Sequence, residues 1–209
     1  RHGVLFIVNA VFSVMLLGMI FLFNNRDMFL DVGVGILLAV LLSRIFGVDL
    51  SSQLILAGVG FSLLPDLDIF VELAKRGRVG GRVQGHHREL THFPLTYLPV
   101  WFLVYSFLGP MYGWLFGLAA AVHFLHDSVG MGWGIKWLWP FSRRAYKFFS
   151  NKDGSFSGRF LVSWSPAELK TVIHNHGDDH WLKNFYFKLH PIAVFEFLIF
   201  IIALIVLYV

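Results

Sequence analysis

The chain has 209 residues and a formal net charge of +4; 56% of its residues are hydrophobic and 14% are charged. Soluble domains contain about 45–50% apolar and about 25% charged residues, so this composition indicates an integral membrane protein. The chain has no cysteine, which excludes disulfide bonds and thiolate metal sites and leaves its ten histidines as the nitrogen ligands.

Six apolar stretches are candidates to cross the bilayer, whose core of about 30 Å takes roughly 20 helical residues. The third is short and ends at Pro65, and the fifth carries Gly113 and Gly117 at the four-residue spacing of closely packed membrane helices. We therefore expect an all-α integral membrane protein with about six transmembrane helices. In chain order they are Val4–Phe23, Met28–Phe46, Leu50–Leu64, Phe93–Leu108, Tyr112–His126 and Ile192–Val209.

Residues 128–191 are more polar and predict a small extramembrane insertion. Arg143–Ser150 and Ser155–Trp164 flank a turn of Asn, Lys, Asp and Gly, which favours a β-hairpin. Ser165 then begins a capping box that predicts a helix to about Asn175. The expected division is a membrane domain at 1–127, an insertion at 128–191 that lies in the cytosol or at the membrane interface, and a last transmembrane helix at 192–209.

The distribution of basic residues predicts how the chain is oriented in the membrane. With six helices, the 65–92 connection and the 128–191 insertion emerge on the same side, which carries 15 of the 17 lysines and arginines; only Arg1 and Arg44 fall on the other. Cytoplasmic loops of membrane proteins are enriched in these residues. We therefore expect this side to face the cytoplasm.

The first candidate site residues follow the third apolar stretch. Asp66 and Asp68 form a D-x-D pair at a helix end, which can hold a divalent ion from two directions. The alternative is a pair of solvated residues that cap the helix.

The second group immediately precedes the fourth apolar stretch. His87 and His92 are candidate metal ligands, Arg88 is suited to grip phosphate with two parallel hydrogen bonds, and Thr91 can hold a ligand or substrate oxygen. The alternative is a cluster of histidine and arginine that contacts lipid headgroups.

The third group ends the fifth apolar stretch. His123 and Asp127 are four residues apart on one helical face, so both side chains can grip one ion. An imidazole within an apolar helix is costly without a partner, although a hydrogen bond between these two residues would also satisfy it. His126 ranks below His123 as a ligand.

Taken together, three separate segments carry six oxygen and nitrogen ligands to one membrane face. One or two divalent ions fit this set, zinc first, with manganese or magnesium as alternatives. Such ions lower the pKa of a bound water and polarise phosphoryl oxygens. The candidate metal ligands are Asp66, Asp68, His87, His92, His123 and Asp127; the candidate catalytic residues are Arg88, Asp66 and Thr91.

Three further polar features have less specific interpretations. His174, His176 and His180 can cap the site or bind metal, but a solvated helix end explains them better. Glu196 can pair with a basic group of the insertion or extend toward the interface. The basic loop at 76–82 resembles a mobile lid that attracts anionic lipid, and its alternative is a loop that only sets topology.

Four motifs in this order resemble the membrane-bound metal-dependent hydrolase family, also described as LexA-regulated inner-membrane hydrolases. They are Pro65-Asp66-Leu67-Asp68, His87-Arg88-Glu89-Leu90-Thr91-His92, His123-Phe124-Leu125-His126-Asp127 and Trp139-Pro140-Phe141. The resemblance covers roughly residues 50–145 and implies metal-dependent hydrolase activity in the inner membrane. Glu89 and Phe93 depart from the glycine and serine that are usual in the family. The motif set is also similar to that of zinc-dependent phospholipases.

We therefore expect an enzyme that hydrolyses a phosphoester of a membrane lipid or a lipid-linked substrate by metal-activated water at the cytosolic face. A non-catalytic metal-binding membrane protein or transporter is the first alternative. A membrane scaffold that recruits a cytosolic partner through the insertion is the second. The expected partners are the bilayer and a lipid substrate, and we expect no nucleic acid.

Overall fold

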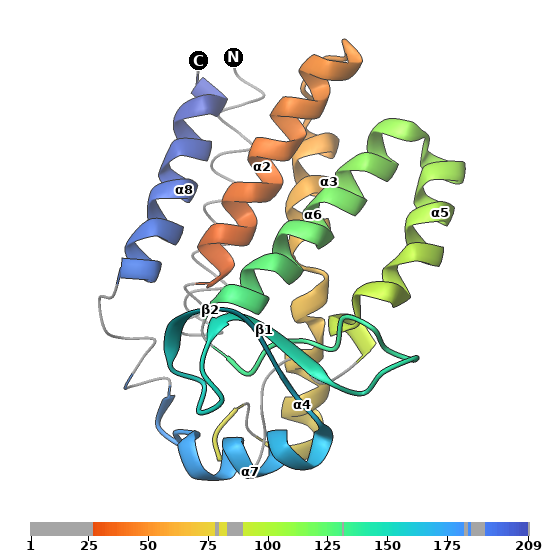
Figure 1. Cartoon of the computed structure of the whole chain (residues 1–209). Helices are drawn as coiled ribbons and strands as arrows, with labels where there is room; N and C mark the ends of the chain where they lie inside the picture. Colours follow the sequence, from red (N-terminus) through yellow and green to blue (C-terminus); the bar gives the residue numbers. More distant parts are fainter. Residues whose placement is uncertain are drawn as a thin grey trace. The chain divides into compact units, whose positions relative to one another are not determined.

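The computed structural model describes residues 27–77, 80–82, 90–130, 132–181, 184 and 191–208 (Figure 1). This part of the chain is mostly helical and contains one two-stranded sheet, as the sequence predicts. The predicted span Val4–Phe23 lies outside the described residues. The α-helices are α2 (Asp27–Phe46), α3 (Ser52–Leu63), α4 (Asp68–Arg76), α5 (Tyr97–Leu108), α6 (Pro110–Val129), α7 (Pro166–His176) and α8 (Pro191–Tyr208).

Two helices in the described ranges are long and apolar enough to cross a membrane, with spans at Phe29–Phe46 and Pro191–Tyr208. The broken pair Ser52–Leu63 and Pro65–Arg76 would make a third if it forms one span. The helix in Pro94–Leu108 is apolar but shorter. The prediction of a helical membrane protein is therefore supported, and the prediction of six transmembrane helices is not. Tyr112–His126 is helical within the 20-residue α6, but its histidines lower the average hydropathy.

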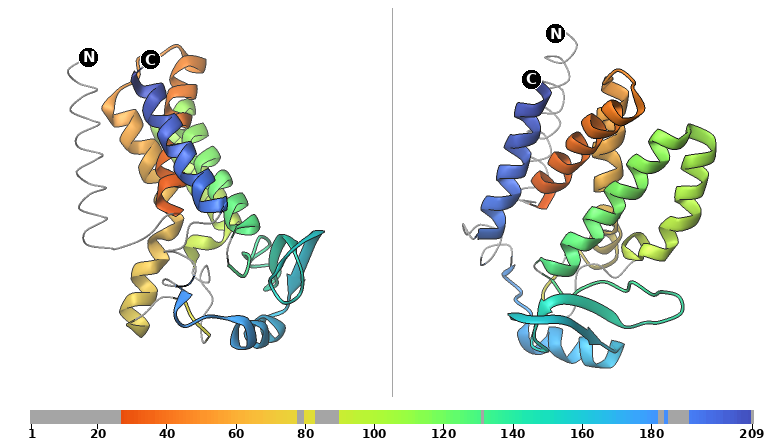
Figure 2. Two further views of the ribbon diagram at one scale, coloured as in Figure 1. Left: turned by 90° about the vertical axis from the view of Figure 1, so that its left-hand side faces the viewer. Right: turned by 45° about the horizontal axis from the view of Figure 1, so that its top comes forward.

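The chain divides into two compact units. The first contains the described residues of Arg1–Leu63, Val104–Ala119 and Phe185–Val209, and the second contains those of Leu64–Leu103 and Ala120–Asn184. In the first unit α2 packs against both α3 and α8 (Figures 1 and 2). Its buried core includes Val32, Ile36, Leu54, Ile55, Leu115 and Phe200.

Glycines let the helices of the first unit approach closely. A Cβ atom added at Gly35 of α2 would lie 2.5 Å from the backbone oxygen of Gly58 in α3, and one added at Gly58 would collide with Gly35 in return. Gly33 meets the backbone of Phe200 in α8 in the same way, at 2.9 Å. Small residues at such crossings favour helix association in membranes, because the backbones can come into direct contact.

The second unit contains the predicted hairpin and helix. Strands β1 (Ala145–Ser150) and β2 (Phe156–Trp164) pair antiparallel, with Ala145 opposite Trp164. Ser165 caps α7 in the predicted capping box, with Pro166 at its first position. Helix α7 covers one part of the hairpin, where Val162 and Trp164 pack against Leu169 and Ile173 (Figure 2). The division into residues 1–127, 128–191 and 192–209 stays a prediction.

The contact between Gly35 and Gly58 gives a test of the first unit. Gly35→Ala should lower the thermal unfolding midpoint of the detergent-solubilised protein, because overpacking of this kind costs about 1–3 kcal/mol. Gly60→Ala in α3 is the matched control: nothing lies within 4 Å of the added atom, and alanine favours a helix by about 1 kcal/mol over glycine. Tryptophan fluorescence during heating measures both, and equal midpoints for the two variants would contradict the contact.

Candidate metal centre

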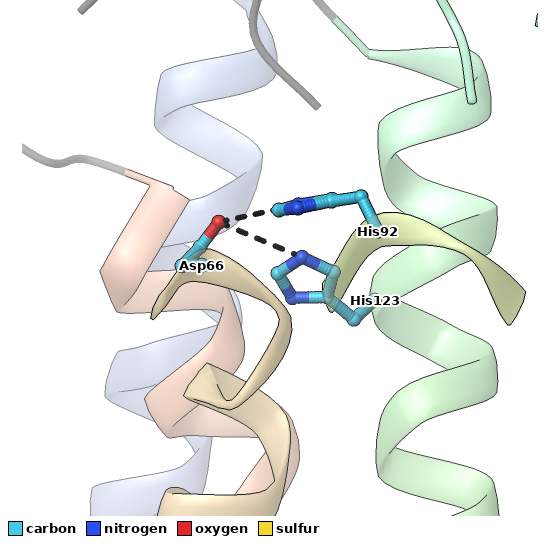
Figure 3. A group of neighbouring side chains, drawn as sticks. All are labelled: Asp66, His92 and His123. Atoms are coloured by element: carbon cyan, nitrogen blue, oxygen red, sulfur yellow. Dashed lines mark ion pairs between the residues drawn. The ribbon is translucent and has the colours of Figure 1, made fainter. Parts of the chain in front are cut away.

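Short helical turns and one long helix place the candidate ligands, all within the second unit. Asp66 lies in the 3-10 turn η1 (Pro65–Leu67), and Asp68 begins α4 directly after it. His92 ends the 3-10 turn η2 (Leu90–His92). His123 and Asp127 are one turn apart in α6. The three predicted segments therefore do converge (Figure 3).

Four ligand atoms surround one point. The Nε2 atom of His92 lies 3.7 Å from Asp66 Oδ1 and 3.3 Å from Asp127 Oδ2. The Nε2 atom of His123 lies 3.6 Å from Asp66 Oδ1 and 3.2 Å from Asp127 Oδ2. Figure 3 shows both imidazole rings directed toward the Asp66 carboxylate. Asp66, His92 and His123 alone form a group whose ligand atoms lie within 4.8 Å of one another.

The distances between imidazole and carboxylate are close to those between neighbouring ligands of one metal ion. Zinc binds histidine nitrogen and carboxylate oxygen at about 2.0–2.2 Å, so the ligand atoms of a tetrahedral site lie about 3.3–3.6 Å apart. The four distances from imidazole to carboxylate, 3.2–3.7 Å, match this range. Two carboxylates and two ring nitrogens are also all able to donate a lone pair, so a cation at their centre would satisfy all four together.

The four side chains differ in exposure. Relative exposures of the side chains are 0% for His92, 2% for His123, 9% for Asp127 and 17% for Asp66. Water or substrate therefore has its easiest approach beside Asp66. Asp66 also makes the two longer distances of the four.

Asp68 lies at the opposite side of the His92 ring from this point. Its Oδ2 is 2.9 Å from Nδ1 of His92, and its side chain is 2% exposed. A carboxylate on the second ring nitrogen of a metal-binding histidine fixes the tautomer and the orientation of the ring. The prediction that Asp68 is itself a ligand is therefore less suited to this geometry than an orienting role.

The remaining candidate site residues are not among the four that surround the central point. His87 and Arg88 lie outside the described residues, so their proposed roles stay predictions. Thr91 adjoins His92, and its Oγ1 is buried without a hydrogen-bond partner in the described ranges. His126 faces the other oxygen of the Asp127 carboxylate, with Nδ1 at 3.7 Å from Oδ1, and so lies off the central point.

Aromatic side chains surround the cluster, and sequence reasoning did not single out two of them. Phe124 contacts both imidazoles, with ring centroids 6.5 Å from His92 and 6.0 Å from His123, and Tyr97 packs edge-on against it at 4.9 Å. Both residues lie in apolar stretches where aromatics are common. Their only sequence signal is adjacency: Phe124 follows His123, and Tyr97 lies five residues after His92.

Two tryptophans of the 128–191 insertion take part in packing within the second unit. Trp139 stacks on Phe93 with ring centroids 4.9 Å apart, directly beside His92. The indole of Trp137 donates a 2.8 Å hydrogen bond to the hydroxyl of Ser128 in α6. The Trp139-Pro140-Phe141 motif therefore supports the segment that carries His92.

The second polar cluster lies apart from these four ligands. His174, His176 and His180 are exposed, in agreement with a solvated helix end. The backbone N–H of Arg82 donates to the Asp179 carboxylate at 3.0 Å, and its side-chain Nε donates to the Gly177 carbonyl at 3.0 Å. Glu196, expected near an interface, is buried in α8 with 2% exposure.

The apolar helices and the buried group of two histidines and carboxylates define a membrane protein with a candidate metal-binding site. Residues 27–209 match the model of the YdjM inner membrane protein family. The chain belongs to this family. It is therefore an inner-membrane protein, as the motifs of the sequence imply. No curated protein and no solved structure matches it.

The charges around His92 predict how the site responds to pH. Burial lowers the pKa of this residue, but Asp127 and Asp68 more than offset burial and raise the pKa from 6.5 to about 9. The proton on His92 therefore stabilises chelator-treated protein fully below about pH 6.5, and this stabilisation is lost as the pH rises through about 9. Zinc affinity should change in the opposite direction and rise with pH, because the ion displaces that proton.

Thermal unfolding with chelator and zinc titration, each between pH 6 and 9.5, measure the two effects. In His92→Gln both dependences should flatten, whereas in His176→Gln, on the exposed end of α7, they should remain. An unfolding midpoint that rises with pH in chelator would contradict this assignment.

Proposed function

We propose that this protein is a metal-dependent hydrolase that cleaves a phosphoester of a membrane lipid or lipid-linked substrate. The observation that supports it is the convergence of two imidazole nitrogens and two carboxylates on one point. Histidine and carboxylate without thiolate are the ligands of hydrolytic metal sites. The resemblance of the four sequence motifs to metal-dependent hydrolases agrees with this assignment.

The geometry suggests a separate role for each carboxylate. His92, His123 and Asp127 make the shorter distances and would hold the ion, a set of two histidines and one carboxylate that also occurs in catalytic zinc sites. Asp66 is the most exposed of the four and would accept the proton of the attacking water. The ion would supply a water of lowered pKa and polarise a phosphoryl oxygen.

Three further residues would act around this centre. Asp68 would hold the His92 ring in position through Nδ1. Thr91, whose hydroxyl is buried beside His92, would bind a substrate oxygen. Arg88 would hold the phosphate with two hydrogen bonds and stabilise the charge that develops on it. One ion, zinc first, is supported by this geometry; a second ion would require His87.

A non-catalytic metal site is the competing function, and one observation favours it. Four protein ligands complete a tetrahedral zinc site, which is the arrangement of structural sites, whereas catalytic sites keep a position open. Metal binding would then stabilise the second unit without chemistry. The role of Asp66 separates the two functions. Hydrolysis needs the coordination position at Asp66 to be open to water, whereas a structural site needs Asp66 as a permanent fourth ligand.

The matched pair Asp66→Asn and Asp127→Asn tests the proposal. We expect Asp127→Asn to lose the ion and turnover together, because Asp127 makes the two shortest contacts. Asp66→Asn should keep the ion and lose turnover by about 10²–10⁴-fold, the typical contribution of a general base. Metal analysis of the purified protein and hydrolysis of a panel of phospholipids and phosphoesters provide the two measurements.

The control variant His176→Ala should leave both measurements unchanged, since this residue is exposed on α7. Metal loss in Asp66→Asn, with zinc-dependent thermal stability and no hydrolysis by the unmodified protein across the panel, would favour the structural site instead. Full metal occupancy in His92→Ala/Asp127→Ala would contradict the site altogether.

We further propose that the loop at Arg82 and the hairpin turn at Asn151 both face the cytoplasm, in an arrangement of six membrane crossings. Because the chain has no native cysteine, single cysteines at positions 44, 82 and 151 can be labelled in intact cells. Only position 44 should react with a membrane-impermeant reagent, following the asymmetry of basic residues. Labelling of position 82 would reverse the orientation, and different results for 82 and 151 would contradict six crossings.

A further inference from the structure

The part of the hairpin around Phe149 and residues 156–161 exposes several large apolar side chains. Phe156 is 81% exposed, Phe160 67%, Leu161 45% and Phe149 38%. Both faces of β2 are open there, since residues 158–161 are all exposed, whereas Val162 and Trp164 at the other end are buried. A contiguous patch of exposed apolar side chains indicates a binding surface, whereas single exposed apolar residues are common on any protein.

Three phenylalanines of the hairpin form one cluster. The ring of Phe160 lies 5.4 Å from that of Phe148 and 5.8 Å from that of Phe149. The pairing of the two strands is irregular here, since Phe148 pairs with Leu161 and Ser150 pairs with Phe156. Such an irregularity redirects side chains, as a β-bulge does.

The backbone is strained at Phe149, whose ring belongs to the cluster. Phe149 has a φ of 50°, and in the described ranges it is the one residue other than glycine with a positive φ. The left-handed conformation of a bulky residue costs about 1–3 kcal/mol and persists where the surrounding structure enforces it. Lys147 and Ser150, which lie on either side of Phe149 in β1, are buried and hold this part of the strand in place.

Basic residues outnumber acidic ones in the hairpin and in the segment that precedes it. Residues 132–164 contain six lysines and arginines and one carboxylate, Asp153. Lys152 and Arg144 are near Glu168 of α7, at 3.3 and 3.6 Å. Arg143 and Arg159 are exposed and have no ion-pair partner in the part of the chain that the structure describes. Arg159 lies between Phe156 and Phe160 in β2.

We propose that this end of the hairpin docks into the interface of an anionic lipid bilayer. The phenylalanines Phe149, Phe156 and Phe160 would enter the boundary between headgroups and acyl chains, while Arg159 binds a headgroup phosphate. Exposed aromatic side chains combined with a local excess of positive charge are the features of surfaces that bind such membranes. The chain is already anchored in a membrane by its apolar helices, so this partner is always within reach.

The same surface would suit a second protein less well. Protein interfaces contain charge pairs of both signs around an apolar centre, whereas the charged side chain among the exposed phenylalanines of β2, Arg159, has no ion-pair partner in the described ranges. The proposal does not depend on the metal site, because none of its residues belongs to that cluster.

Depth-dependent quenching on the full chain tests the proposal. Phe156→Cys and Leu161→Cys are labelled with an environment-sensitive fluorophore, and Lys170→Cys on the exposed face of α7 is the matched control. Each variant is placed as a single copy in lipid nanodiscs of phosphatidylcholine and phosphatidylglycerol. Labels at 156 and 161 should be quenched by nitroxide-bearing lipids and shielded from aqueous iodide, and the label at 170 should show the reverse.

A second experiment tests the contribution of positive charge to docking. Arg159→Gln should shift the docking equilibrium roughly fivefold toward the undocked state, the effect of one basic residue near an anionic surface. Lys170→Gln should not shift it, and discs of phosphatidylcholine alone should weaken the shielding at position 156. Each labelled variant is first checked for an unchanged thermal midpoint, and labels at 156 and 161 serve as replicates for each other.

Two results would overturn the proposal. Equal access of iodide to positions 156 and 170 would mean that the cluster stays in water. Shielding from iodide without quenching by nitroxide lipids, in discs that hold one chain, would mean that another segment of the protein covers the phenylalanines.

Discussion

The second unit depends on the balance of charge between buried carboxylates and imidazoles. Asp68 and Asp127 are almost fully buried and His92 completely so, and such groups are stable only when each charge has a partner. His92 meets Asp68 with one ring nitrogen and the Asp66 and Asp127 carboxylates with the other. This requirement ties η1, α4, η2 and α6 together, although more than fifty residues separate Asp66 from His123 along the chain.

The two units solve different physical problems. Close helix packing at glycines such as Gly35 and Gly58 holds the first unit together, as suits helices in lipid, where apolar burial gives little driving force for association. The second unit satisfies buried polar groups and builds a small core around Trp164 and Ile173. Family membership, apolar helices and a candidate metal site in one chain are the observations from which the hydrolysis of a membrane-held substrate is proposed.

The docking of the hairpin and the proposed hydrolysis are separate but compatible. Arg159 would attract anionic headgroups, and the proposed phosphoester hydrolysis would also act on phosphate. The exposed phenylalanines need no role in catalysis. Phe149, whose backbone is strained, is not one of the buried residues that form the core around Trp164 and Ile173.

Local patterns in the sequence determined the helices, the hairpin, the capping box at Ser165 and four central ligand candidates, because these signals depend on neighbours within one or two turns. The four-residue spacing of His123 and Asp127 already placed both side chains on one face of a helix. Tertiary structure alone separated Asp66 from Asp68: both follow Pro65, but only the fold shows that one faces the common point and the other the far nitrogen of His92. It also revealed Tyr97, Phe124 and the register shift at Phe149. These features depend on which side chain meets which across distant segments, and periodicity along the chain carries no information about that.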